Sequence, residues 1–284
     1  FRRCAPVLAL LFGTLVNATS CDQTESNDDQ LALAALVIAN STTTVPVSLV
    51  NGSTAVSCGD SFSIGTGPTT VRIRDFRIYL SEFAWITPDG EISATLPDIE
   101  GWQKENAVLI DLENGSSDCA TSGTSSTNSQ IVLSAPPSNA TGLAFSVGLP
   151  VTLNRLSNTT SDSPYNITAL YWSWTTGYKF AKVELTDGTN VYNFHLGSLS
   201  CTGGAGNITC SREMKGRVEL NGLTSGKTLQ FDLSKWFNGQ VYAAESCMSN
   251  DPGTRCSTLR ERLGLTNASG NATASNADAF KVGD

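Results

Sequence analysis

The chain of 284 residues is poor in the residue types on which metal and hydrolytic sites usually depend. It contains one histidine, His195, and only two methionines. It has no C-x-x-C pair, no G-x-S-x-G, no H-E-x-x-H and no phosphate-binding loop. A site built from two imidazoles of this chain is therefore excluded. Nothing in the sequence indicates a hydrolase, and we expect a protein that is not an enzyme.

Charged residues are also scarce, at 15% of the chain, and the balance is acidic, with 26 acidic against 18 basic residues and a net charge of −8. Nucleic acids and anionic membrane surfaces are bound through basic faces. The charge balance therefore argues against a nucleic-acid partner. Hydrophobic residues make up 40% of the chain, which is enough for a substantial core.

The apolar run near the N-terminus, VLALLFGTLV (7–16), is too short to cross a bilayer. Two arginines precede it, and the small residues Ala-Thr-Ser follow just before Cys21. This pattern predicts a lipoprotein-type signal peptide over residues 1–20, with Cys21 as the lipidated residue. An ordinary signal peptide is the alternative. We expect an exported protein of the periplasm, outer membrane or cell surface, touching the membrane only through a lipid anchor. Ten N-x-S/T sequons keep a eukaryotic secreted protein open as an alternative to a bacterial one.

Six cysteines remain when Cys4 and Cys21 are set aside: Cys58, Cys119, Cys201, Cys210, Cys247 and Cys256. An even number in an exported chain is typical of disulfides, although six cysteines allow fifteen pairings. The last four form two pairs that are close in sequence, which would leave the first two to bond with each other. A thiolate metal site is the weaker alternative, because there is no C-x-x-C and only one histidine.

Alternating apolar and polar residues predict strands through most of residues 45–265. Residues 180–185 and 191–196 form a predicted hairpin around Asp187-Gly188, and a further strand is expected at 170–175. We predict an all-β fold, an antiparallel β-sandwich with long loops and one or two short helices, stapled by disulfides. Residues 21–44 are interpreted as a tether and N-terminal segment, and residues 266–284 as a flexible tail.

The stretch from Ala169 to Cys210 gathers the side chains with the most chemical capability. If its strands pair, Trp172 and Trp174 could lie close to His195. An imidazole suits copper or zinc, although an inert histidine at a sheet rim is the simpler interpretation.

Each of the other candidate residues also has a simpler structural interpretation. The tryptophans Trp172 and Trp174 could simply fill the core. Met248 is a candidate soft ligand for Cu(I), and its alternative is a partly exposed loop methionine.

Three acidic residues, Asp111, Glu113 and Asp118, flank a Gly/Ser-rich loop and could bind calcium. Their spacing does not match an EF-hand, so a solvated acidic loop is the preferred interpretation.

Several blocks of sequence, in order, resemble the MbnP family of metallo-mystery-pair four-cysteine proteins. The blocks are DFRIYLSEF (75–83), WQKENAVLIDLENG (102–115), GLAFSVGLPVTLN (142–154), YWSWTTGYKF (171–180), FHLGSLSC (194–201), FDLSKWF (231–237) and CMSNDPGTRC (247–256). The resemblance covers roughly residues 45–265 and implies an MbnP-like β-sandwich domain there.

The resemblance implies a function in metal handling. Members of the family are paired with a MauG-type di-haem partner, similar to cytochrome c peroxidases, that oxidises a tryptophan to kynurenine. The modified residue takes part in copper binding together with histidine. Carried over to this chain, the tryptophan is Trp172 or Trp174 and the histidine is His195.

The chain departs from the family pattern at Asn154-Arg155, where the family often has Asn-His. A guanidinium group has no lone pair to offer a metal. A surface lipoprotein that has kept the fold for adhesion or ligand binding and lost the metal is therefore an alternative. A hydrolase would need a nucleophile beside His195.

Overall fold

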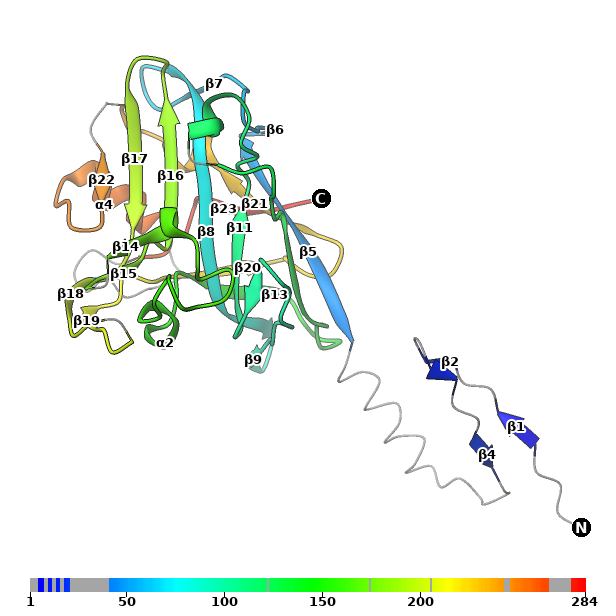
Figure 1. The fold of residues 1–284 in the computed structure, drawn as a ribbon. Coiled ribbons are helices and arrows are strands. Elements are labelled where there is room, and N and C mark those ends of the chain that lie inside the picture. The colour runs from blue at the N-terminus through cyan, green and yellow to red at the C-terminus, as the bar shows by residue number, and fades with distance from the viewer. Residues whose placement is uncertain are drawn as a thin grey trace, which may run out of the picture. The chain divides into compact units, whose positions relative to one another are not determined.

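The structure is a computed structural model that describes residues 41–121, 123–173, 175–204, 206–242, 246–265 and 277–284, with the backbone of four short strands between residues 5 and 20. By their internal contacts, Phe1–Ser41 form one unit and Thr42–Asp284 another (Figure 1). The predicted lipidation site Cys21 and the candidate ligand Trp174 lie outside the described residues.

The N-terminal unit contains two pairs of short antiparallel strands. In the first pair, β1 (Ala5–Val7) lies beside β4 (Ala18–Ser20). In the second, β2 (Leu10–Leu11) lies beside β3 (Thr14–Leu15). Both pairs fall within the predicted signal peptide. No helix among the described residues is long and apolar enough to cross a membrane.

The larger unit is organised around one long strand, β8 (Thr69–Thr87), which pairs with five other strands. Its core-facing apolar residues are mostly two positions apart, but Ile73 and Phe76 are three positions apart. The pairing with β16 is irregular at this point, where Asp75 and Ile73 lie opposite consecutive residues. A β-bulge adds one residue to a strand. Both halves of β8 therefore present apolar side chains to the same core.

The larger sheet has ten strands, nine of them besides β8, and all but one of its pairings are antiparallel. The nine are β7 (Phe62–Ile64), β9 (Gly90–Ser93), β10 (Gln103–Lys104), β11 (Ala107–Asp111), β13 (Gly142–Val147), β16 (Ala181–Thr186), β17 (Val191–Leu196), β20 (Gly216–Asn221) and β22 (Cys247–Met248). The predicted hairpin of β16 and β17 is confirmed, in antiparallel register from Ala181–Leu196 to Thr186–Val191. At the edge, the short β22 runs parallel to β17.

The second sheet has five strands, with order β12-β5-β21-β23 and β6 beside β5. Their bounds are β5 (Thr42–Asn51), β6 (Thr54–Ala55), β12 (Gln130–Ser134), β21 (Thr228–Asp232) and β23 (Phe280–Gly283). Aromatic side chains join the two sheets. Phe76 of β8 meets the ring of Phe231 at 5.0 Å, and Phe145 of β13 meets Phe280 at 5.3 Å. These contacts form the core of the predicted sandwich, and the all-β fold class is confirmed.

Two short hairpins and five short helical segments also occur among the described residues of the larger unit. The hairpins are β14 (Tyr171–Ser173) with β15 (Gly177–Tyr178), and β18 (Leu199–Thr202) with β19 (Thr209–Arg212). The helical segments are η1 (Ser117–Thr121), α2 (Val151–Asn154), η2 (Thr168–Leu170), α3 (Leu233–Trp236) and α4 (Thr254–Glu261). Asp232 caps α3 by accepting the Ser234 N–H, and it also accepts a hydrogen bond from Lys281 at 2.7 Å.

The described residues contain three disulfides, Cys58–Cys119, Cys201–Cys210 and Cys247–Cys256. They follow the pairing that sequence proximity favours, and they exclude the alternative of a thiolate metal site. The last of them joins β22 to α4.

The predicted flexible tail differs from the structure at its end. Residues 280–283 form β23 and pair with β21, and Phe280 is buried. The apolar residues Phe280 and Val282 are too few to show a strand period in the sequence. A neighbouring strand with unpaired backbone groups is what orders this segment.

Candidate functional site

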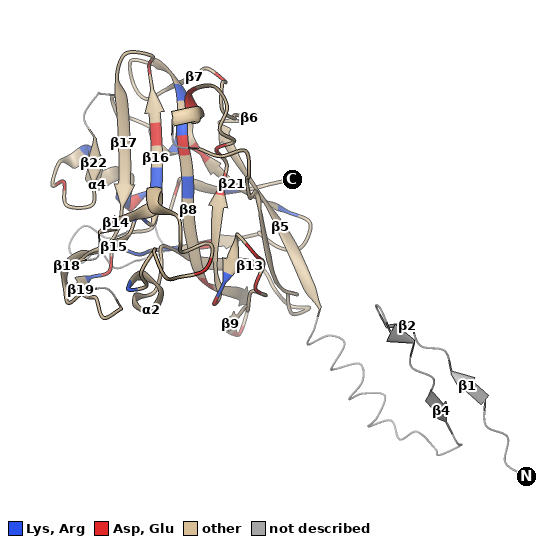
Figure 2. Ribbon diagram, viewed as in Figure 1, with Lys and Arg blue, Asp and Glu red and all other residues tan. Residues whose placement is uncertain are grey.

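Five polar or soft side chains form one row across the larger sheet, one from each of five neighbouring strands. In register, the row consists of Asp111 (β11), Arg77 (β8), Lys182 (β16), His195 (β17) and Met248 (β22). Residues in register on neighbouring strands point to the same face of a sheet. Figure 2 shows acidic and basic residues close together on β16 and β8, the two strands that carry Lys182 and Arg77. We call these five residues the polar row.

Polar side chains reach this face because charged and apolar residues alternate along β16. Ala181, Val183 and Leu185 belong to the hydrophobic core. Lys182 and Glu184 therefore point to the opposite face. They are nevertheless shielded from solvent, with side-chain exposures of 6% and 12%.

The charges on this face are connected without a break from β8 to β17. The fully buried Asp75 accepts hydrogen bonds from Arg77 Nε at 2.8 Å and from Lys182 Nζ. Lys182 Nζ also lies 3.1 Å from Glu184 Oε1, which is 2.9 Å from His195 Nε2. Each buried charge thus has a partner of opposite sign, as burial requires.

The inner end of the polar row contradicts the expectation of a solvated acidic loop. Asp111 and Glu113 are buried, and Arg77 Nη1 lies 3.7 Å from Glu113 Oε1. Burial, together with the neighbouring Glu113 carboxylate, raises the pKa of Asp111 to about 8. Only Asp118 is partly exposed, and it pairs with Arg72 at 2.5 Å.

At the outer end, Glu184 fixes the tautomer of His195. Burial raises the pKa of Glu184, but the hydrogen bond from His195 and the charge of Lys182 outweigh it and lower the pKa to about 2. The carboxylate is therefore ionised at neutral pH and can only accept a hydrogen bond, so His195 Nε2 carries the donated proton. In the neutral imidazole, Nδ1 then holds the lone pair available to a metal. A carboxylate behind a histidine is the usual support of a metal ligand.

Trp172 lies against His195 at the surface. The two ring centroids are 6.4 Å apart and the planes meet at 88°. Trp172 is 36% exposed, so the interpretation of this residue as core filling is wrong. A Cβ on Gly197 would lie 2.6 Å from the Tyr178 carbonyl and 3.2 Å from the Trp172 ring. Glycine at this position therefore allows the end of β17 to pass beneath the indole.

Met248 belongs to the edge strand β22 rather than to a loop, and its side chain is half-buried. Its register with His195 places the two side chains on one face. Hydrogen bonds hold this edge in place, because Arg260 Nη1 donates to the Met248 carbonyl at 3.1 Å and Gly197 N–H donates to Ser249 Oγ at 2.7 Å. The structure thus brings together three of the predicted ligands.

Arg155 is an exposed residue at the C-terminal end of α2. Its neighbour Asn154 is buried and holds the hairpin that carries Trp172. The Asn154 side chain accepts the Tyr178 N–H at 2.8 Å and donates to the Thr176 carbonyl at 3.2 Å. Asn154 is therefore structural, and Arg155 adds no ligand to the site.

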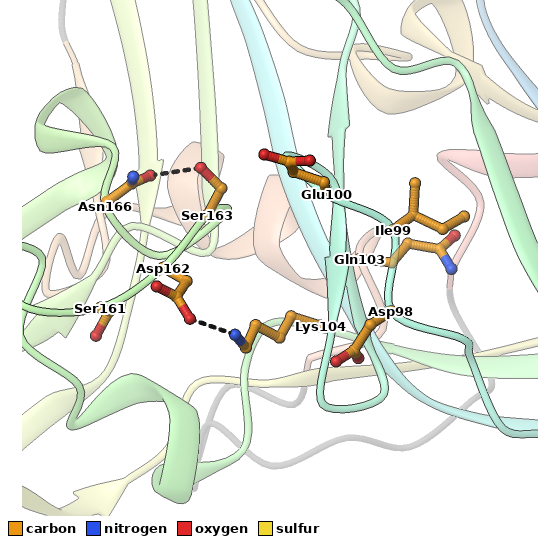
Figure 3. Close-up of a pocket in the computed structure, with 9 residues that line it drawn as sticks. All are labelled: Asp98, Ile99, Glu100, Gln103, Lys104, Ser161, Asp162, Ser163 and Asn166. Atoms are coloured by element: carbon orange, nitrogen blue, oxygen red, sulfur yellow. Dashed lines mark hydrogen bonds and ion pairs between the residues drawn. The ribbon is translucent and has the colours of Figure 1, made fainter.

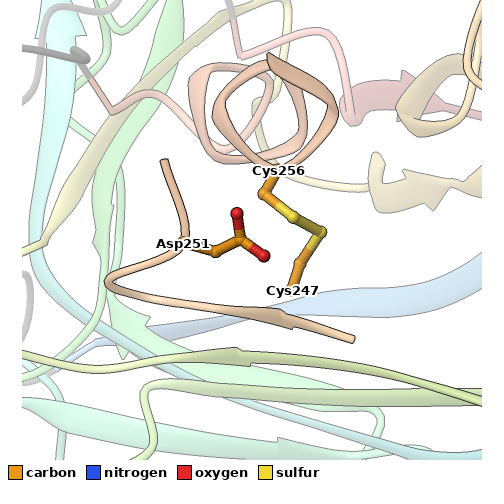
Figure 4. Close-up of side chains that lie close together, drawn as sticks. All are labelled: Cys247, Asp251 and Cys256. Atoms are coloured by element: carbon orange, nitrogen blue, oxygen red, sulfur yellow. A yellow bond between two sulfur atoms is a disulfide. The ribbon is translucent and has the colours of Figure 1, made fainter. Parts of the chain in front are cut away.

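A second grouping of metal-ligating residue types is not a metal site in the oxidised protein. The ligand atoms of Cys247, Asp251 and Cys256 lie within 4.8 Å of one another. However, the two sulfur atoms are bonded to each other, as Figure 4 shows. A disulfide sulfur is not a thiolate, which is the form that binds metals.

A polar pocket of ≈ 460 Å³ lies between the loop before β11 and the loop at residues 161–166. Figure 3 shows Lys104 and Asp162 meeting across it, with their charged atoms 2.5 Å apart. Asp162 is 78% exposed, so this is a solvent-exposed ion pair. None of the polar row lines this pocket.

Asp75, Lys182 and Glu184 are not among the site residues predicted from the sequence. The signal that could have found two of them is the segment AKVEL (181–185), where a basic and an acidic residue alternate with apolar ones. Alternation of this kind is also typical of a strand with one solvated face. The burial of that face depends on distant segments.

Comparison with known proteins agrees with this architecture. Residues 40–250 match the MbnP family, which is more than half of the chain. The solved structure of MbnP from Methylosinus trichosporium is similar, with a TM-score of 0.70 and 22% sequence identity, and the match covers 86% of this chain and 98% of that one. This likeness shows a shared fold. No curated protein matches the sequence. The chain belongs to the MbnP family.

Proposed function

We propose that this protein binds copper at the outer end of the polar row, with His195 Nδ1 as the principal ligand. The observation that carries the proposal is the grouping of His195, Met248 and the exposed Trp172 at one edge of the sheet. Glu184 supports the proposal because it holds the His195 ring in the tautomer that a metal ligand needs.

The donor set fits Cu(I) better than a metal that needs four protein ligands. A thioether and an imidazole are ligands that copper accepts, and thioethers favour the reduced ion. The chain has one histidine, and Arg155 supplies no lone pair, so tetrahedral binding through several imidazoles is excluded. We therefore expect a site of few ligands that is completed by a group other than histidine.

Trp172 is the residue that we propose as the completing group after oxidation to kynurenine. An external di-haem enzyme of the cytochrome c peroxidase type would catalyse this oxidation, with a peroxide as the oxidant that is reduced. This protein would be the substrate of that enzyme rather than an enzyme itself. Support comes from the position of Trp172, which is 36% exposed while its ring lies perpendicular to that of His195, with 6.4 Å between the centroids. An exposed ring can lose electrons to a docked partner, and oxidation there would place new donor atoms beside the imidazole.

We also propose that the protein is exported and anchored by lipid at Cys21. The pattern of residues 1–21 and the three disulfides of the larger unit support an oxidising compartment outside the cytoplasm. The anchor would keep copper handling at the membrane surface, in the periplasm or on the cell surface.

The proposal is tested by mass spectrometry and copper analysis of protein made together with its haem partner. A gain of two oxygen atoms with loss of CO is expected on the peptide that contains Trp172, along with bound copper. The variant His195→Asn should lose copper while keeping the modified tryptophan. Trp172→Phe should lose both signals, whereas Trp102→Phe, a change of the same kind at a partly buried tryptophan elsewhere, should lose neither.

The departure from the family pattern at Arg155 favours a second function. In this alternative the protein is a surface lipoprotein with the same fold that binds a ligand other than a metal. Unmodified tryptophan together with no copper in the unaltered protein would support this alternative and refute copper binding. Retention of copper by His195→Asn would refute the assigned ligand.

A further inference from the structure

A small polar pocket of ≈ 300 Å³ lies next to the edge strand β22. It is lined by Arg212, Ser249, Asn250, Asp251, Ser257 and Arg260, with one proline. Ser249 directly follows Met248, so this pocket adjoins the outer end of the polar row. Two of its lining residues are arginines, which is unusual in a chain with a net charge of −8.

Arg260 is a buried wall of the pocket, with 8% of its surface exposed. It donates to two backbone carbonyls, from Nη1 to Met248 at 3.1 Å and from Nη2 to Asp251 at 2.7 Å. Each of these nitrogens carries two hydrogens, so each retains a second N–H. Burial lowers the pKa of Arg260, and although the Asp251 charge raises it, the nearby Arg212 lowers it further.

Arg212 lines the same pocket. Its Nε is buried and makes no hydrogen bond among the described residues. A buried donor without an acceptor costs on the order of 1–3 kcal/mol, so such groups are normally paired with protein, water or an ion. The two guanidinium groups therefore line a common space, and each has N–H groups that make no hydrogen bond among the described residues.

The one carboxylate of the pocket is committed to its own loop. Asp251 Oδ1 accepts the Gly253 N–H at 2.8 Å, and the carboxylate lies within 4.8 Å of the Cys247 and Cys256 sulfurs. Figure 4 shows this carboxylate directed towards the disulfide. It makes no ion pair with Arg212, whose charge is left for a ligand.

We propose that this pocket binds a small oxyanion of the phosphate, sulfate or carboxylate type between Arg212 and Arg260. Guanidinium groups match the oxygen atoms of such anions through paired, charge-assisted hydrogen bonds. The exposed amide of Asn250 can add a further donor at the rim. The site is separate from the proposed copper ligands and does not depend on copper.

The test is isothermal titration calorimetry of inorganic phosphate, and separately of acetate, into the full chain at neutral pH and constant ionic strength. Saturable binding of one anion per chain is expected for at least one of the two. Arg212→Gln should weaken it about tenfold or more, the factor expected for a lost charged hydrogen bond. Lys235→Gln, which removes one positive charge from an exposed side chain on α3, should bind as the unaltered protein does.

Binding of phosphate alone would identify a tetrahedral oxyanion, and binding of acetate would identify a carboxylate. Absence of saturable binding for both anions would overturn the proposal, as would equal affinity in Arg212→Gln. An equal loss in Lys235→Gln would also overturn it, because the effect would then reflect net charge. Circular dichroism of Arg212→Gln should show an unchanged fold, since Arg212 has no described side-chain partner to lose.

Discussion

Replacing Asp75 by asparagine tests whether Asp75 and the buried charges of the polar row that contact it stabilise the sheet as a connected network. Asp75 is fully buried and lies between Arg77 and Lys182, with hydrogen bonds to both. Asparagine has nearly the same shape but no charge. The change therefore leaves two buried cations without their shared partner, and the volume of the core stays the same.

The expected loss of unfolding free energy depends on the ion-pair partners that Arg77 and Lys182 keep. Removing one member of a buried ion pair usually costs about 3–5 kcal/mol of unfolding free energy. Arg77 keeps Glu113 at 3.7 Å, and Lys182 keeps Glu184 at 3.1 Å, so the loss should lie near the lower end. We expect about 3 kcal/mol for Asp75→Asn, which lowers the urea midpoint by about 1 M if the denaturant slope is about 3 kcal/mol per molar.

The assay is urea unfolding at neutral pH with the disulfides intact, followed by tryptophan fluorescence and circular dichroism. Asp162→Asn is the matched control, because it removes the same charge from an ion pair with Lys104 in which Asp162 is 78% exposed. Its midpoint should equal that of the unaltered protein within error. A midpoint for Asp75→Asn that equals the control would refute the reasoning.

Two further predictions concern stability. The pKa of Asp232 is lowered, because hydrogen bonds from N–H groups and a lysine outweigh the effect of burial. The ionised Asp232 therefore stabilises the fold above its unfolded pKa of about 3.9, and this stabilisation is lost as the pH falls through the folded pKa. Asp232→Ala should lower the unfolding free energy by about 2 kcal/mol at pH 7, and by less below about pH 4 in urea titrations. A loss that stays constant with pH would contradict this. Removing the Cys58–Cys119 bond, whose cysteines are 61 residues apart, should cost about 4 kcal/mol, and removing Cys201–Cys210, with a separation of 9, about 2.7 kcal/mol. The order of the melting temperatures of the two double alanine variants checks this.

The parts of the fold that the sequence predicts correctly have local signals. The hairpin of β16 and β17 combines strict alternation with the Asp187-Gly188 turn, and both features lie within sixteen residues. The residues that cap α3 and α4 also lie next to these helices in the sequence. Asp232 accepts the first N–H groups of α3, and Gly264, with φ of 87°, follows α4. Strand existence, turns and caps are therefore predictable without any knowledge of tertiary contacts.

The candidate site depends on contacts between distant segments, and this part could only be predicted in outline. Met248 meets His195 because β22 pairs in parallel with β17, and a parallel pair has no hairpin turn that would reveal it. Burial of Lys182 and Asp75 is equally non-local. Each looks like an ordinary surface charge on an alternating strand until other segments cover the outer face of the sheet.

The physical consequence of the polar row is that the surface site is tied to the buried centre of the sheet. His195 is oriented by Glu184, and Glu184 is held ionised by Lys182, which in turn is anchored on the fully buried Asp75. A histidine supported in this way loses little further freedom when it binds a ligand. A metal site with few ligands would therefore need less binding free energy from each of them. The buried charges thus have a role in a protein whose only imidazole has no second histidine to assist it.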